Sequence, residues 1–74
     1  MTLEKHSCKL NGHATSITIE RPFWDIVEHI ADENGQSITS LLEEIDGARD
    51  GNLSSAIRLY VLDYVIGKGT MGSV

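Results

Sequence analysis

The amino-acid sequence predicts a mainly α-helical fold with a short N-terminal β-ribbon, assembled as an intertwined homodimer. Residues 15–20 alternate between apolar and polar side chains, which is typical of a half-buried strand. Two amphipathic helices and an almost wholly apolar third helix follow. An isolated strand is not stable in water, and a chain of this length buries only about 60% of its unfolded surface. We therefore expect a second copy of the chain to cover the strand and the last helix.

A hairpin is predicted before the helices, because Asn11-Gly12 is the strongest two-residue turn signal in the chain. The predicted cross-strand pairs are Leu10 with His13, Cys8 with Thr15, and His6 with Ile17. One face of this hairpin is mostly apolar and holds His6, Cys8, Leu10, His13, Thr15, Ile17 and Ile19. The other is polar and basic and holds Lys5, Ser7, Lys9, Ala14, Ser16 and Thr18. The alternative is that residues 1–12 form a loose arm instead of an outer strand.

Three helices are predicted from apolar spacing and end signals. The first spans Pro22 to Asn34, with Gly35 just past its end. The second is capped by Ser37 and ends at Gly47 or at Asp50-Gly51. The third runs from about Leu53 to Ile66 after a cap at Asn52 or Ser54. Its apolar residues surround nearly the whole helix, so burial on several sides is expected. The predicted division is an arm or outer strand (1–12), a folded domain (13–66) and a flexible tail (67–74).

The net charge of −5 is unevenly distributed along the chain. Residues 1–22 contain three basic and two acidic residues, a balance of 3 − 2 = +1. Residues 23–50 contain one basic and eight acidic residues, or 1 − 8 = −7, and the remainder carries +1. A net negative charge argues against strong nucleic-acid binding. The acidic residues, however, are concentrated in the segment of the first two predicted helices, and the N-terminal segment has a net charge of +1.

The sequence favours neither an enzyme nor a cofactor protein. His6, Cys8 and His13 could share one hairpin face, but their spacing matches no standard zinc site, and Cys8 is interpreted as a small buried side chain. The carboxylates Glu43, Glu44 and Asp46 are interpreted as a solvated helix face. The aromatic residues Trp24, Tyr60 and Tyr64 are interpreted as core. No catalytic constellation or phosphate-binding loop is present.

Cellular location is predicted from two features. Cys8 is the only cysteine, which suits a reducing compartment, and no apolar run reaches the roughly 20 residues that span a bilayer. We therefore expect a cytoplasmic protein without a membrane partner.

The order and spacing of these elements resemble those of a known protein family. Thr15–Ile19, Pro22, Phe23–Ile30 and Ala31–Ser40, with the turn Glu33-Asn34-Gly35 and Ser37 two residues later, resemble the ribbon-helix-helix (Arc/MetJ-like) family of bacterial DNA-binding proteins. The segment from His13 to Leu62 is similar to a bacterial branch with an extra C-terminal helix. The resemblance implies a dimeric transcriptional regulator that inserts a β-ribbon into the major groove.

The resemblance also implies roles for individual residues. Ala14, Ser16 and Thr18 would face the bases, and Ser37 and Thr39 at the start of the second helix would hold a phosphate. Lys5 and Lys9 could add phosphate contacts. The base-facing residues are short, whereas direct readout uses long Arg, Lys, Asn or Gln side chains, and an outer strand would widen the ribbon beyond the two strands that the groove admits.

Two functional classes therefore remain open. The first is a dimeric DNA-binding regulator with DNA as its partner. The second is an antitoxin-like or adaptor dimer that binds another protein, which the acidic helices, the short ribbon side chains and the apolar third helix favour. Fold alone does not decide between them.

Overall fold

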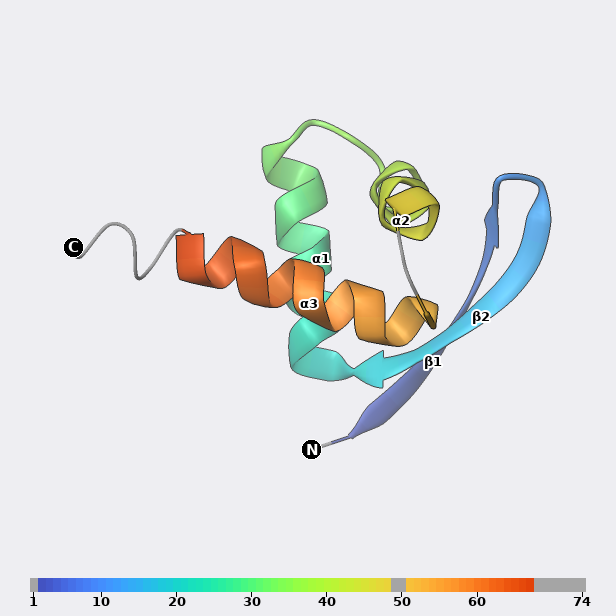
Figure 1. Ribbon diagram of the computed structural model, residues 1–74, viewed down its shortest axis with the longest axis horizontal. Helices are drawn as coiled ribbons and strands as arrows, with labels where there is room; N and C mark the ends of the chain where they lie inside the picture. Colours follow the sequence, from blue (N-terminus) through green and yellow to red (C-terminus); the bar gives the residue numbers. More distant parts are fainter. Residues whose placement is uncertain (1, 49–50, 68–74) are drawn as a thin grey trace.

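The computed structural model describes residues 2–48 and 51–67, and it has a two-stranded antiparallel sheet followed by three helices (Figure 1). The elements are β1 (Leu3–Leu10), β2 (His13–Glu20), α1 (Arg21–Glu33), α2 (Ile38–Ala48) and α3 (Leu53–Val65). This confirms the predicted mainly helical fold with an N-terminal β-ribbon and a third helix. Apart from Gly67, the predicted flexible tail lies outside the described residues.

The hairpin has the predicted register. The strands pair from Leu3 opposite Glu20 to Leu10 opposite His13, so β1 is a full outer strand and not a loose arm. Asn11 and Gly12 have φ angles of 51° and 85°. Positive φ at both turn positions is the geometry of a type I′ turn, which matches the right-handed twist of the flanking strands.

The first helix begins at Arg21, places Pro22 in its first turn, and ends at Glu33, one residue earlier than predicted. Gly35 follows with φ of +66°, a conformation that favours glycine. Its N–H donates to the Asp32 carbonyl, and the Gln36 N–H donates to the Ala31 carbonyl. These two bonds form a Schellman motif, which explains why the helix stops here.

Side-chain caps begin the other two helices. The Ser40 N–H donates to Ser37 Oγ at 3.0 Å, which confirms Ser37 as the cap of α2. The Ser55 N–H donates to Asn52 Oδ1 at 2.8 Å, so Asn52 caps α3. Ser54, the alternative cap, instead donates its hydroxyl to the Thr18 carbonyl at 3.0 Å. This bond joins the start of α3 to β2.

The core lies between the inner face of the hairpin and the three helices. Its buried members are Leu10, Ile17, Ile19, Trp24, Val27, Ile30, Ala31, Leu41, Leu42, Ile45, Ile57 and Val61. The alternation predicted for β2 is confirmed, because Ile17 and Ile19 are 1% and 0% exposed while Ser16 and Thr18 face solvent.

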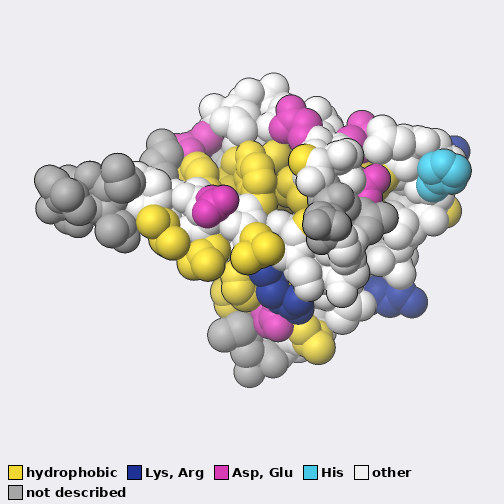
Figure 2. Space-filling model, viewed as in Figure 1, with side chains coloured by type: hydrophobic (Ala, Val, Ile, Leu, Met, Phe, Trp, Pro, Cys, Tyr) yellow, Lys and Arg dark blue, Asp and Glu magenta, His cyan; other side chains and the backbone are white. Residues whose placement is uncertain are grey.

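The third helix is less buried than the sequence predicts. Only Ile57 and Val61 of α3 are buried, and Leu59 and Leu62 are 64% and 51% exposed. Figure 2 shows hydrophobic side chains gathered on the surface over the C-terminal half of this helix. Cover by a second copy therefore stays a prediction. No helix in residues 2–48 and 51–67 is long and apolar enough to cross a membrane.

Candidate nucleic-acid interface

The solvent-exposed face of the hairpin carries the residues predicted to meet DNA. We call it the outer face, and it consists of Lys5, Ser7, Lys9, Ala14, Ser16 and Thr18, all exposed. Cross-strand pairing places Lys9 opposite Ala14 and Lys5 opposite Thr18. Each lysine therefore stands beside one of the short residues predicted to face the bases.

The outer face is basic even though the chain is acidic. It carries two lysines and no carboxylate, whereas the whole chain has a net charge of −5. The next residue of β2 on this side, Glu20, accepts a hydrogen bond at 2.8 Å from Arg58 Nε of α3. This bond lowers the pKa of Glu20, with a smaller contribution from a backbone hydrogen bond. The carboxylate at the margin of the outer face is thus paired with a cation.

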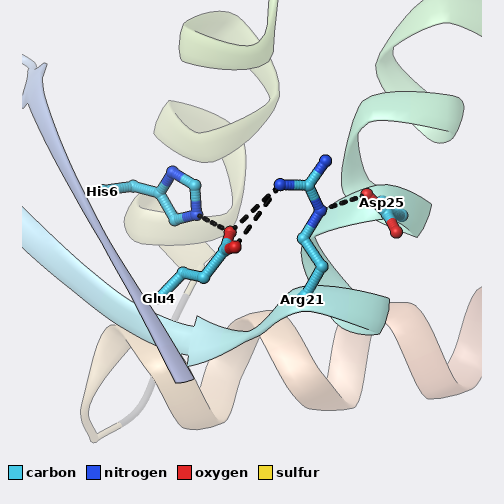
Figure 3. Close-up of polar contacts among 4 residues, drawn as sticks. All are labelled: Glu4, His6, Arg21 and Asp25. Atoms are coloured by element: carbon cyan, nitrogen blue, oxygen red, sulfur yellow. Dashed lines mark hydrogen bonds and ion pairs between the residues drawn. The ribbon is translucent and has the colours of Figure 1, made fainter. Parts of the chain in front are cut away.

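A polar network fixes the start of β1 against α1 (Figure 3). Arg21 lies between two carboxylates, with its Nε 2.9 Å from Asp25 and its Nη1 3.3 Å from Glu4. These contacts raise the pKa of Arg21, mainly through the Asp25 bond. Glu4 also lies 3.4 Å from His6 Nε2. The His6 ring stacks on Trp24 with a centroid separation of 3.8 Å and an interplanar angle of 11°.

The network joins the start of β1 to the first turns of α1. Arg21 also donates its backbone N–H to the Thr2 carbonyl at 3.2 Å, which extends the pairing beyond the start of β1 and the end of β2. Sequence reasoning missed these contacts. Arg21 and Glu4 are 17 residues apart, and no local pattern signals their pairing.

One edge of β2 has no strand beside it in the described chain. In a two-residue hairpin the pair next to the turn is hydrogen-bonded, and the pairs then alternate. The backbone N–H and C=O groups of Ala14, Ser16 and Thr18 therefore point away from β1. The Thr18 carbonyl accepts the Ser54 hydroxyl, and a carbonyl can accept a second bond. This edge can pair with another strand.

Comparison with known proteins decides the family. The family model described as "Ribbon-helix-helix domain" matches residues 3–65, which include both strands and all three helices. The chain belongs to the ribbon-helix-helix family. Members of this family are usually DNA-binding transcription regulators or antitoxins.

A solved structure supports the same fold. The ribbon-helix-helix chain is similar to an uncharacterized protein from Bordetella pertussis Tohama I, with 29% sequence identity and a TM-score of 0.82. The match covers 99% of this chain and 62% of the other, so this chain spans less than two thirds of the solved protein. No curated protein matches.

In a single chain, the predicted phosphate site at the start of α2 is exposed, but one of its hydroxyl groups already makes a hydrogen bond. Ser37 and Thr39 are exposed at the first turn, where helix N–H groups lack helical partners. The Ser37 hydroxyl already caps the Ser40 N–H. Among the described residues, no hydrogen bond or ion pair links Ser37 or Thr39 to the outer face, so the two predicted sites are not joined within one chain.

Carboxylates of α2 lie at the turn end of the hairpin. Glu43 accepts the Asn11 N–H through Oε2 at 2.8 Å. A cavity of about 260 Å³ next to it is lined by Leu10, His13, Ala14, Thr15, Asp46 and Leu53. The negative charge of Asp46 disfavours phosphate here, so the outer face, and not the turn, is the candidate contact surface.

The described residues contain no group of three or more His, Cys, Asp or Glu that could hold a metal ion. Cys8 is half-buried, and burial raises the pKa of its thiol. Tyr60 and Tyr64 pack against the core, as does the buried Trp24. The Tyr64 hydroxyl donates to Glu33 of α1, which raises the pKa of Tyr64.

Proposed function

We propose that this chain is a dimeric DNA-binding protein, and a transcriptional regulator, that lays the outer face of its hairpin against the duplex. One observation carries the proposal. The outer face bears Lys5 and Lys9, and the one carboxylate on this side of the hairpin, Glu20, is paired with Arg58, on a chain whose net charge is −5. Positive charge gathered on one face attracts the phosphate backbone even when the total charge is negative.

The dimer forms along the open edge of β2. Antiparallel pairing of two β2 strands centred on Ser16 places Ala14 opposite Thr18 of the partner subunit. The result is a four-stranded sheet in the order β1-β2-β2-β1. Its two outer faces form a single surface with four lysines. Family membership supports this assembly, because ribbon-helix-helix proteins are typically dimeric DNA binders.

A four-stranded sheet meets DNA differently from a two-stranded ribbon. Three strand spacings of about 4.8 Å give a backbone width of roughly 14 Å, whereas the major groove is about 12 Å wide and admits two strands. We therefore place Ala14, Ser16 and Thr18 of the central strands over the groove. Lys5 and Lys9 of the outer strands then lie over the phosphates on either side, and the α2 starts at Ser37 and Thr39 add backbone N–H donors.

This arrangement predicts affinity that comes mainly from phosphates. Short side chains at the centre offer little bidentate base readout. Four lysines that neutralise about four phosphates correspond to a slope of about −3.6 in a plot of log K against log salt. We expect modest discrimination between duplex sequences and a strong dependence on salt.

The test is fluorescence anisotropy of labelled random duplex across a salt series. Lys9→Glu puts negative charge on the outer face without touching the core, and we expect it to abolish binding with little change in melting temperature. The matched control is Glu28→Lys, because Glu28 is exposed on α1, away from the outer face. This control should bind as the wild type does.

The outcomes separate the candidate functions. A wild-type chain that shows no salt-dependent association, or a Lys9→Glu variant that binds equally well, would reject the DNA-binding proposal. Tighter binding by Glu28→Lys would assign the interaction to bulk charge. The favoured function would then be that of an adaptor or antitoxin-like dimer. The first surface to test for a protein partner is the group of acidic side chains on α2 (Glu43, Glu44 and Asp46).

A further inference from the structure

The third helix has a row of large apolar side chains outside the core. We call Leu59, Leu62 and Ile66, the residue that follows α3 with helical backbone angles, the α3 stripe, and they are 64%, 51% and 43% exposed. Val65 beside it is 45% exposed. At 100° per residue, the stripe faces away from Ile57 and Val61, the residues that α3 buries in its own chain.

The spacing of the stripe matches a helix–helix contact. Its members are three and four residues apart, and Ser55 stands four residues before Leu59. Alternating steps of three and four are the a and d positions of a two-helix coiled coil. Leu59 and Ile66 then occupy a positions, and Ser55 and Leu62 occupy d positions.

The flanking charges select the partner and its direction. Arg58 and Asp63 stand on opposite sides of the stripe, at the g and e positions. In a parallel pair, a g residue faces the e residue that lies five positions later on the other helix. Arg58 would therefore face the partner's Asp63, and Asp63 would face the partner's Arg58. An antiparallel pair would put like charges together. Arg58 Nε already donates a hydrogen bond to Glu20. A guanidinium has five N–H donors, so Arg58 can also donate to a second carboxylate.

From this spacing and charge complementarity, we propose that the α3 stripe packs in parallel against the α3 stripe of a second copy of this chain. The stripe spans only about two heptads, which is short for a self-sufficient coiled coil. The contact therefore adds to another interface. The stripe and the open edge of β2 are different surfaces, and we place their contacts on separate two-fold axes, which together give a tetramer. The proposal does not depend on DNA binding.

The first experiment is disulfide trapping in the full chain with Cys8 changed to Ser. In a parallel pair Leu62 lies beside its own counterpart, whereas an antiparallel pair would place it beside Leu59 or Ile66 of the other helix. We expect Leu62→Cys to form a covalent dimer under mild oxidation. Leu3→Cys is the matched control, because Leu3 is 56% exposed but lies on β1. Cross-linking of Leu62→Cys no faster than this control would overturn the parallel contact.

The second experiment needs no disulfide. Leu59→Glu combined with Leu62→Glu should halve the mass measured by sedimentation while the helical circular dichroism signal is kept. Leu3→Glu should leave the mass unchanged. An unchanged mass in the double variant would overturn the proposal. Loss of mass together with loss of helical signal would overturn it too, because the stripe would then belong to the core of the primary dimer.

A charge test completes the design. Asp63→Arg would face Arg58 of the partner subunit and should weaken the association at low salt. Asp32→Arg, on the exposed surface of α1, is its control. Equal effects of the two variants would overturn the parallel direction. Lys9→Glu should not change the mass, so failure of the DNA proposal and failure of this one are distinguishable.

Discussion

Ile17 is the residue on which the orientation of the hairpin depends. It is 1% exposed, and its neighbours Ser16 and Thr18 face solvent. Because strand side chains alternate, a slip of one residue would exchange these two environments.

We therefore expect Ile17→Asp to lower the free energy of unfolding by several kcal/mol, since it buries an unpaired charge. Ser16→Ala and Thr18→Ala should change it by less than about 0.5 kcal/mol, as is usual for exposed positions. Urea denaturation followed by circular dichroism measures both. A severe loss in Thr18→Ala with a mild one in Ile17→Asp would contradict the observed register.

Residue-level prediction from sequence succeeds here where the physical signal is local. The Asn11-Gly12 turn fixed the register, and Gly35, Ser37 and Asn52 marked helix ends because each acts on neighbouring backbone groups. The turn and the alternation of side chains together predict the outer-face residues. The register also predicts His6 on the inner face, but its stacking on Trp24 depends on how the hairpin and α1 pack, which no local pattern encodes.

At the scale of elements, the ion pair between Glu20 and Arg58 joins the end of β2 to α3 across 38 residues of sequence. Sequence reasoning could not find it for that reason. The same limit applies to α3 as a whole: its composition predicts burial all round, but only its packing shows which side the single chain leaves exposed.

The Glu20–Arg58 pair predicts a specific dependence on pH. Its hydrogen bond lowers the pKa of Glu20 below the ordinary value of 4.5. The pair therefore stabilises the fold above the unfolded-state pKa, and this stabilisation is lost as the pH falls through the folded-state pKa.

We expect Glu20→Gln to be less stable than the wild type at neutral pH, with the difference shrinking on acidification below about pH 4.5. Thermal unfolding at a series of pH values measures it. Glu28→Gln, which alters an exposed carboxylate of α1, should not reproduce the pattern. A stability gap that stays constant down to low pH would show that the Glu20 charge is not involved.

For the whole molecule, the open edge of β2 and the α3 stripe both argue that folding and association are linked. A single chain leaves Leu59, Leu62, Val65 and Ile66 in water, and it exposes the backbone groups of a strand edge. Anything that binds only the folded state raises the melting temperature as its concentration rises.

We therefore expect the melting temperature of this chain to rise with protein concentration across the micromolar range. The measurement is circular dichroism melting at several concentrations, with sedimentation to give the mass at each one. A melting temperature that is independent of concentration, with a monomeric mass, would show that one chain is sufficient.

The stack of His6 on Trp24 also has a practical consequence. Trp24 is the only tryptophan in the chain, so all indole emission comes from the place where β1 rests on α1. Intrinsic fluorescence therefore reports detachment of the outer strand separately from the helical signal in circular dichroism. A hairpin that lifts off before the helices melt would give an emission change at lower urea than the ellipticity change, with no label added.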